Sequence, residues 1–295
     1  MRHDLLTETP NPASATIDAL PTLDMLRVIN AADQAIAVAV ERELPNVACA
    51  VDGIVVRLQN GGRLFYAGAG TSGRLGVLDA SECPPTFNTP PELVQGLIAG
   101  GDGALRRSIE RAEDDPAQGR QDLAERGFDG RDALVGIAAS GRTPYVLGAL
   151  AYARSLNALT IGLSCTPNSQ VAQASEIAIT PAPGPEVITG STRMRAGTAT
   201  KLVLNMLSTG VMIRMGYVYG NLMVNVQPTN EKLRDRARRI IASIAGVSYD
   251  EASRLLAEAG SVRIAILMQK LKLTRSEAET RLASAKGRLR VALGE

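Results

Sequence analysis

The stretch Leu64-Phe-Tyr-Ala-Gly-Ala-Gly-Thr-Ser-Gly73 joins a short apolar run to a glycine-rich turn, and the helix-compatible segment Arg74-Leu-Gly-Val-Leu-Asp-Ala-Ser81 follows it. This order is typical of a strand that feeds a helix whose first backbone N–H groups point at an anion. The pattern is short, and glycines also serve plain tight turns, so a purely structural turn is an equal alternative at this point. We therefore predict a strand, a turn and a helix, with an anion site as the functional hypothesis.

Short apolar runs recur along the chain at intervals of about one helix. They are Leu64–Ala67, Leu93–Ala99, Ala133–Ala138, Leu159–Leu163 and Ile177–Thr180. Strands that alternate with helices predict βαβ units, so we expect an α/β fold with a parallel five-stranded sheet flanked by helices. In open sheets of this kind ligands bind beyond the carboxyl ends of the strands, and the residues that follow each strand are the candidate site.

A second candidate anion loop, Ser140-Gly-Arg-Thr143, follows the third apolar run and precedes a helix expected over Tyr145–Ser155, with Pro144 in its first turn. The loop offers two hydroxyls, free backbone N–H groups and a guanidinium that can bind phosphate through two hydrogen bonds. A plain Ser-Gly turn that caps a helix is the alternative. A further polar stretch, Gly190-Ser-Thr-Arg-Met-Arg195, leads into an apolar helix that we expect to cover the sheet or, less simply, to lie in a dimer interface.

The glycine turn fits the two nucleotide-binding patterns poorly. As a dinucleotide fingerprint it lacks a carboxylate at the tip of the second strand, where Ala-Gly-Gly stands. As a triphosphate loop it has Arg74 and Leu75 where Lys and a magnesium-binding Ser or Thr belong. A sugar phosphate or a similar small anion, bound without metal or cofactor, is the ligand that remains.

Composition argues against several partners and mechanisms. The net charge is only +2, and three Phe, six Tyr and no Trp leave little for base stacking, so no nucleic-acid partner is expected. The cysteines Cys49, Cys83 and Cys165 form no Cys-x-x-Cys pair, which argues against a disulfide framework or a zinc site. Because the only histidine is His3, neither a Ser-His-Asp triad nor a His-ligated metal is expected.

The amino-terminal residues Met1 to Pro10 carry acids and prolines where an export signal would need an apolar core. The longest uncharged stretch, Leu202 to Ile213, is well short of the roughly 20 apolar residues that span a bilayer. We therefore expect a cytoplasmic protein with no membrane partner.

Three parts are expected along the chain. Residues 1–60 form an arm and helices that pack on the main domain, and within them residues 7–18 are small, polar and interrupted by prolines, which predicts an extended arm. Residues 61–221 form the sheet domain. Residues 222–295 form a small helical module, with capping-box patterns at Ser248-Tyr-Asp-Glu251 and Thr274-Arg-Ser-Glu277.

Two carboxylates stand out by their context. Glu82 lies in Asp79-Ala-Ser-Glu-Cys-Pro-Pro85, where the two prolines are expected to end the helix and hold the acid near the ligand-binding edge. Glu113 lies in an acidic segment after the second strand. From the sequence around it alone, each glutamate is better explained as an ordinary exposed residue than as a catalytic one.

Several ordered blocks of the chain resemble one enzyme family across nearly its whole length. The blocks are Thr7-Glu8, Asn11, Ser14, Ile17-Asp18, Gly68 to Gly76, Asp79 to Pro85, Ala112-Glu-Asp114, Gly136 to Tyr145, Gly190 to Met194 and Lys201 to Gly210. Together they are similar to the N-acetylmuramic acid 6-phosphate etherases, whose central domain belongs to the sugar isomerase (SIS) domain family.

The resemblance implies a role for particular residues. Glu82 and Glu113 would be catalytic, and the sugar phosphate would be bound by Gly70, Thr71, Ser72, Gly73, Ser140, Gly141, Arg142, Thr143 and Ser191. It also implies a homodimer, no metal or other cofactor, and a carboxyl-terminal module similar to a ubiquitin-associated (UBA) fold.

Direct hydrolysis of an alkyl ether is unfavourable because the ether has a poor leaving group. Elimination followed by addition of water avoids this difficulty, and it needs only proton transfers that carboxylates can perform. In the open aldehyde form of the sugar, loss of the carbon 2 proton allows lactate to leave from carbon 3, and water then adds to the unsaturated aldehyde. By resemblance, Glu82 would act as acid or base in the elimination and Glu113 would activate the water. An aldose-ketose isomerase and a non-catalytic sugar-phosphate sensor are the alternatives that the sequence leaves open.

Overall fold

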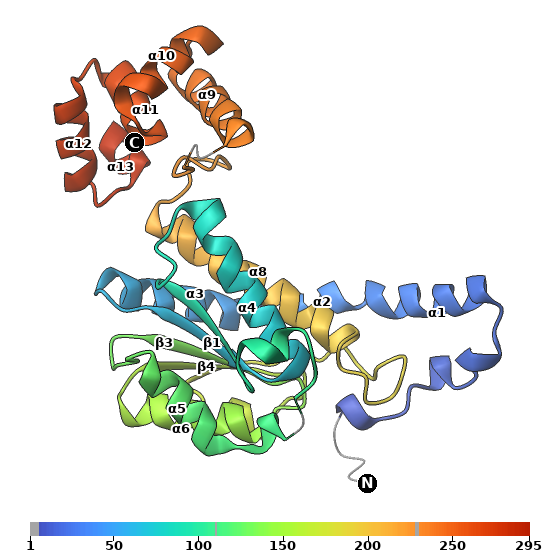
Figure 1. Ribbon diagram of the computed structural model, residues 1–295. Helices are drawn as coiled ribbons and strands as arrows, with labels where there is room; N and C mark the ends of the chain where they lie inside the picture. The colour runs from blue at the N-terminus through green and yellow to red at the C-terminus, as the bar shows by residue number, and fades with distance from the viewer. Residues whose placement is uncertain (1–5, 110, 228–229) are drawn as a thin grey trace. The chain divides into compact units, whose positions relative to one another are not determined.

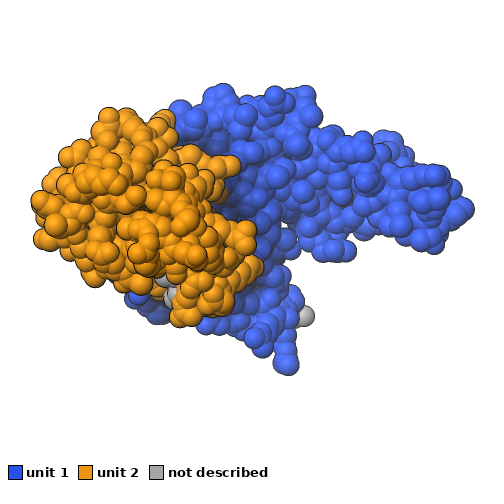
Figure 2. All heavy atoms as spheres, turned by 90° about the horizontal axis from the view of Figure 1, so that it is seen from above, with its two compact units in different colours: residues 1–81, 92–208 blue, residues 82–91, 209–295 orange. Residues whose placement is uncertain are grey.

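The computed structural model describes residues 6–109, 111–227 and 230–295, and the prediction that concerned His3 lies outside them. The chain divides into two compact units, one of residues 1–81 and 92–208 and one of residues 82–91 and 209–295 (Figure 2). The division into functional parts at residues 60 and 221 stays a prediction, because compactness alone does not assign function.

The first unit is built on a five-stranded parallel sheet in the order β2-β1-β3-β4-β5. The strands are β1 Leu64–Gly68, β2 Val94–Ile98, β3 Ala133–Ile137, β4 Leu159–Leu163 and β5 Ile177–Ile179. All five expected strands are present, and each predicted end agrees with the structure or differs from it by one residue. The predicted α/β fold class is confirmed.

Helices cover both faces of this sheet (Figure 1). The α-helices of the first unit are α1 Thr22–Gln34, α2 Ile36–Glu41, α3 Leu44–Gln59, α5 Pro116–Glu125, α6 Pro144–Ser155 and α7 Gln170–Gln173. It also contains most of α4 Gly70–Phe87 and of α8 Arg195–Met215. Its 3-10 turns are η1 Leu6–Glu8, η2 Pro12–Ser14, η3 Ile17–Ala19, η4 Asp102–Leu105 and η5 Ala112–Asp114. On one face Phe65 and Leu134 of the sheet pack with Leu123, Tyr145 and Leu150 of α5 and α6. The connections and layers are therefore those of βαβ units.

Close packing explains several glycines between sheet and helices. A Cβ on Gly96 of β2 would lie 2.5 Å from the Val77 Cα of α4, and a Cβ on Gly136 of β3 would lie 2.8 Å from Val146 of α6. Glycine at these positions lets the helices pack closely against the strands.

The amino-terminal arm is not extended, contrary to the expectation for residues 7–18. It forms three short 3-10 turns, and the Asn11 side chain accepts a hydrogen bond from the Ala13 N–H at 3.0 Å. Side-chain capping of this kind favours a turn over an extended segment. The arm is fixed to the body of the unit, because the Ser14 hydroxyl donates to the Val187 carbonyl at 2.7 Å.

The second unit contains a bundle of short helices. They are α9 Glu231–Ala245, α10 Tyr249–Ala259, α11 Val262–Leu271, α12 Arg275–Ser284 and α13 Leu289–Leu293. Their apolar faces form a common core that includes Ile241, Ala265 and Leu267. Thr274 and Glu277 form the predicted capping box. On α9, Arg238 pairs with Glu231 and Arg239 pairs with Asp235 of the same helix. No helix among the described residues has both the length and the apolar character to cross a membrane.

Candidate active site

The strand order creates a crevice between β1 and β3. From β1 the chain passes through α4 to β2 at one side, and it then returns across β1 through α5 to β3. The helices that follow β1 and β3 lie on opposite faces of the sheet, α4 on one and α6 on the other (Figure 1). Ligands of open α/β sheets bind at such a switch point, and here the last residues of the two strands, Gly68 and Ile137, are paired.

The glycine turn after β1 is tightly packed. A Cβ on Gly68 would lie 2.7 Å from the Gly73 nitrogen, a Cβ on Gly73 would lie 2.6 Å from the Gly68 oxygen, and Gly70 has a φ of +53°. These contacts hold the first turn of α4 against the end of the strand. The side chains of Thr71 and Ser72 are half-buried there and make no hydrogen bond within the described residues, so their hydroxyls are available to a ligand.

The loop after β3 is fixed by its backbone and leaves its side chains free. Gly141 has a φ of +70°, its N–H donates to the Ala138 carbonyl at 2.8 Å, and its carbonyl accepts from the Val171 N–H at 2.9 Å. The half-buried side chains of Ser140, Arg142 and Thr143 have no hydrogen-bond partner in the described ranges. A rigid loop with two free hydroxyls and a free guanidinium next to the start of α6 is well suited to an anion.

The loop after β4 connects these loops to the start of α8. The Cys165 N–H donates to the Ala139 carbonyl at 2.9 Å, and its thiol donates to the Ala196 carbonyl at 3.6 Å. Burial raises the pKa of the Cys165 thiol to about 12, so it stays protonated near neutral pH and is unsuited to act as a nucleophile. A Cβ on Gly197 would lie 3.5 Å from Thr71 Cγ2, which brings the start of α8 to the glycine turn as well.

Ser191 lies in the loop before α8. Glu186 and the amino-terminal arm both form hydrogen bonds that hold this loop in place. The buried Glu186 carboxylate accepts hydrogen bonds from the Arg195 and Ala196 N–H groups at 2.8 and 2.9 Å and so caps the helix. From the amino-terminal arm, the Thr7 carbonyl accepts from the Gly190 N–H at 3.2 Å. The half-buried Ser191 lies in this fixed loop, a few residues before the Gly197 contact with the glycine turn.

Glu113 lines a cavity of about 320 Å³ next to the glycine turn. Gly70 and Arg74 form part of its wall, and Arg111 and Glu113 approach from η5 and the residue before it. The Arg74 guanidinium donates to the Ala104 carbonyl at 2.7 Å and the Leu105 carbonyl at 3.1 Å, which ties η4 to α4. The structure thus brings Glu113 together with the predicted glycine turn, although they are separated by a whole strand in sequence.

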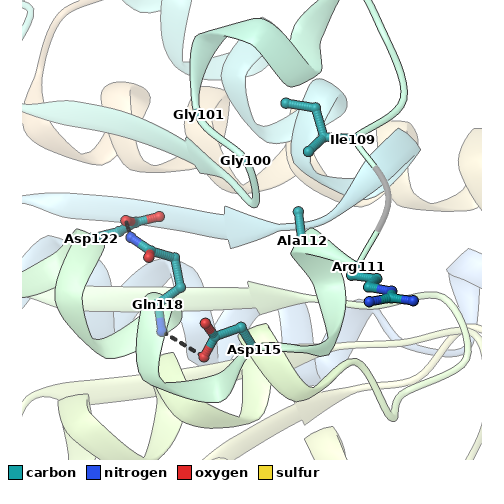
Figure 3. A pocket seen from close by; sticks show the side chains of 8 residues that line it. All are labelled: Gly100, Gly101, Ile109, Arg111, Ala112, Asp115, Gln118 and Asp122. Atoms are coloured by element: carbon teal, nitrogen blue, oxygen red, sulfur yellow. Dashed lines mark hydrogen bonds between the residues drawn. The ribbon is translucent and has the colours of Figure 1, made fainter.

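A second, larger cavity of about 540 Å³ is lined in part by the same residues (Figure 3). It shares Ile109, Arg111 and Ala112 with the smaller one. Gln118 and Asp122 of α5 and the N-cap residue Asp115 complete the polar part of its lining. Asp122 accepts a hydrogen bond from the Tyr145 hydroxyl at 2.6 Å, and burial, followed by this bond, raises the pKa of Tyr145. Two carboxylates against one guanidinium make this cavity a poor site for an anion.

Glu82 is an exposed residue of α4 and belongs to the second unit. The expectation that Pro84 and Pro85 end the helix is wrong, because α4 continues to Phe87 and the Asn88 N–H still donates to the Pro84 carbonyl at 2.8 Å. The prolines remove two helical donors, but the last carbonyl of the helix accepts a bond from the buried Asn225 side chain. This tertiary contact explains why the helix persists beyond the prolines.

One turn before Glu82, α4 is anchored by a buried carboxylate. Asp79 accepts hydrogen bonds from the Tyr66 hydroxyl at 2.9 Å and the Ser208 hydroxyl at 3.1 Å, and the Lys201 amine lies 3.8 Å away. Burial raises the pKa of Asp79, against the opposing effect of these partners. The network fixes this part of α4 to β1 and α8.

No three or more His, Cys, Asp or Glu side chains in the described part of the chain are grouped so as to hold a metal ion. The polar groups at the carboxyl edge are hydroxyls, backbone N–H groups and guanidinium groups. Such a set is suited to binding a phosphate, and the Glu113 carboxylate in the neighbouring cavity is a group that can transfer protons.

Comparison with known proteins gives consistent results. Residues 46–154 match the family model of the glucokinase regulatory protein N-terminal SIS domain. A phosphoheptose isomerase from Francisella tularensis has the same fold, with a TM-score of 0.53 and 21% identity over 66% of this chain and 100% of that one. N-acetylmuramic acid 6-phosphate etherases from Aeromonas hydrophila and Caldanaerobacter subterraneus are 56% and 54% identical, over 96% and 97% of this chain and 95% and 94% of theirs.

The chain belongs to the N-acetylmuramic acid 6-phosphate etherase family. Etherases are carbon-oxygen lyases, so this is a family of enzymes built on an SIS domain. The family membership predicted from the sequence blocks is confirmed.

Three residues of the candidate site were not predicted from the sequence. Arg74 and Arg111 line the cavity of Glu113, and Glu186 caps α8 beside Ser191. Arg74 directly follows the glycine turn, which was a usable signal. The sequence around Arg111 and Glu186 contains no comparable signal, because the positions of these residues depend on contacts made by distant segments.

Proposed function

We propose that the protein cleaves the D-lactyl ether of N-acetylmuramic acid 6-phosphate and releases N-acetylglucosamine 6-phosphate and D-lactate. The observation that carries this proposal is 54% to 56% identity to proteins named for that etherase activity, over almost the entire length of both chains. The free polar groups beyond β1 and β3 support it, because they suit a phosphorylated sugar. The activity would serve the recycling or breakdown of cell-wall amino sugars.

The proposed reaction proceeds by elimination and then addition. In the open-chain aldehyde, a base removes the carbon 2 proton, the carbon 3–oxygen bond breaks, and lactate leaves with a proton on its ether oxygen. Water then adds to carbon 3 of the unsaturated aldehyde and a proton returns to carbon 2. Carboxylates can perform both proton transfers, and loop N–H groups can stabilise the enolate that forms.

The roles of individual residues belong to this proposal. Ser140, Gly141, Arg142 and Thr143 would bind the phosphate, and the sugar would lie against Ser191 and the glycine-turn residues Gly70, Thr71, Ser72 and Gly73. Glu82 would act as acid or base in the elimination, and Glu113 would activate the water. The free side chains of the loop after β3 and the cavity beside Glu113 support these assignments.

The function is tested by incubating the purified protein with N-acetylmuramic acid 6-phosphate and measuring D-lactate with a coupled dehydrogenase. We expect stoichiometric D-lactate and N-acetylglucosamine 6-phosphate. Conversion of an aldose phosphate to a ketose phosphate without lactate would favour the isomerase. Tight binding of the sugar phosphate without any product would favour the sensor.

We further propose a cytoplasmic homodimer. Helix α1 has no buried residue, and Leu23 and Leu26 are 59% and 52% exposed on a helix that extends away from the sheet of its own unit (Figure 1). Leucines on such a helix would be stabilised by burial against a second copy. Sedimentation should give a dimer mass for the wild type and a lower mass for Leu23→Glu/Leu26→Glu, whereas a monomeric wild type would contradict the proposal.

A further inference from the structure

The cavity of about 320 Å³ beside the glycine turn carries more positive than negative charge. Among its lining residues, Arg74 and Arg111 are cations and Glu113 is the acid. If the protein is an etherase, its substrate carries a carboxylate on the lactyl group in addition to the phosphate. We propose, as an extension of that function, that this cavity holds the lactyl group and that Arg111 binds its carboxylate.

The stereochemistry of the reaction connects the lactyl group to this cavity. N-acetylmuramic acid is the 3-O-lactyl ether of N-acetylglucosamine, so substrate and product have the same configuration at carbon 3. The oxygen of water must therefore reach carbon 3 from the face that the lactate oxygen has left. The residue that activates the water faces the space that lactate vacates, and Glu113, which has that role in the proposed function, lines this cavity.

Arg111 is the cation in this cavity with free hydrogen-bond donors. The Arg74 guanidinium is engaged with the Ala104 and Leu105 carbonyls, so it shapes the wall. The Arg111 side chain is exposed at the cavity and has no hydrogen bond or ion pair within the described residues. A guanidinium binds a carboxylate through two parallel N–H···O bonds, which gives both affinity and a fixed orientation.

The backbone of Arg111 has a strained conformation that neighbouring contacts hold in place, although its side chain is exposed. Arg111 has a φ of +62°, in the left-handed region that residues other than glycine rarely adopt. The flanking residues pack on Gly100, where a Cβ would lie 3.0 Å from Ile109 Cδ1 and 3.3 Å from Ala112 Cβ. These contacts compensate the local strain and hold the arginine next to Glu113.

In this role, Arg111 would help the enzyme distinguish the lactyl ether substrate from the product sugar phosphate. The cavity is large enough for a lactyl group of a few heavy atoms and for the water that later replaces it, since one water needs about 30 Å³. Binding of the carboxylate would favour substrate over product, because N-acetylglucosamine 6-phosphate lacks that group. It would also orient the leaving lactate so that its departure opens the path for water.

The test compares Arg111→Ala with Arg106→Ala, a matched removal of an exposed arginine that lies on the same connection but does not line the cavity. For each protein, kcat/KM is measured with N-acetylmuramic acid 6-phosphate, and the inhibition constant is measured for N-acetylglucosamine 6-phosphate. We expect Arg111→Ala to lower kcat/KM by about 10- to 100-fold, as for the loss of a hydrogen-bonded charge partner, and to leave the inhibition constant of the product unchanged. Arg111→Lys should recover part of the loss, and Arg106→Ala should change neither value.

Two results would overturn the proposal. If Arg111→Ala weakens substrate and product equally, the arginine serves the common sugar-phosphate frame or the local fold. If it changes neither, the lactyl carboxylate is bound elsewhere. A wild type that releases no lactate would instead reject the etherase function itself, so the two failures can be told apart.

Discussion

Glu82→Gln is expected to lower D-lactate release by about a hundred- to ten-thousand-fold, the usual contribution of a general acid or base. Glutamine keeps the size and polarity of the side chain but cannot exchange the proton that elimination requires. Glu82 is exposed and makes no hydrogen bond within the described residues, so the substitution should leave stability within about 0.5 kcal/mol of the wild type. Enzyme-coupled D-lactate detection and thermal unfolding measure the two effects.

Glu113→Gln should impair the same overall reaction at a later step. Since Glu113 is assigned to water activation, its loss should still permit elimination, so the first turnover releases lactate while the unsaturated aldehyde accumulates. In deuterated water, Glu82→Gln should also slow exchange at carbon 2, and Glu113→Gln should not. Rapid-quench measurements of lactate together with absorbance of the conjugated aldehyde distinguish the two variants.

Glu92→Gln is the matched control, because Glu92 is another exposed glutamate on the connection between α4 and β2. It should retain wild-type rates. If Glu82→Gln releases lactate at the wild-type rate, the proposed mechanism is wrong even though the function stands. If the two variants show the opposite order of defects, the roles of the two glutamates must be exchanged.

The central strands were predictable because β1, β3 and β4 are buried along their whole length, whereas β2 and β5 at the edges are partly half-buried. Parallel strands covered on both faces form continuous apolar runs, as in Leu64-Phe-Tyr-Ala67, and the turn residues at their ends mark the boundaries. The order of the strands then follows from the connections. Knowing that ligands bind at the carboxyl edge was enough to select the two loops that the structure brings side by side.

The errors arose where distant contacts override local rules. Pro84 and Pro85 predict the end of a helix, but Asn225, far away in the sequence, binds the last carbonyl of α4 and the helix continues. The amino-terminal arm has a loop-like composition, yet its turns are bound to residues 185–190. Arg111 becomes part of the site only because pairing of β2 with β1 carries the following loop to the glycine turn. None of these contacts leaves a periodic or spacing signal in the sequence.

The second large effect concerns Gly141, which shapes the proposed phosphate loop. At a φ of +70°, any residue with a Cβ is strained by roughly 1–2 kcal/mol. In addition, the new Cβ would lie 2.2 Å from Ser169 Cβ, so either the loop or the start of α7 must move, at a further cost of about 1–3 kcal/mol. We expect Gly141→Ala to lower the free energy of unfolding by about 2–5 kcal/mol and to raise KM at least about tenfold, because the Ser140 and Thr143 hydroxyls and the loop N–H groups lose their common geometry.

Gly127→Ala separates backbone strain from the effect on the site. Gly127 also has a positive φ, +60°, but a Cβ there would meet no atom within 4 Å, and the residue follows α5 near the amino edge of the sheet. This variant should lose only about 1–2 kcal/mol in urea unfolding and keep the wild-type KM. If Gly141→Ala binds the sugar phosphate as tightly as the wild type does, the phosphate must lie outside the loop after β3. The glycine turn after β1 then becomes the candidate phosphate site. A raised KM for Gly141→Ala alone, at a temperature where both variants are fully folded, would instead support the loop after β3 as the phosphate site.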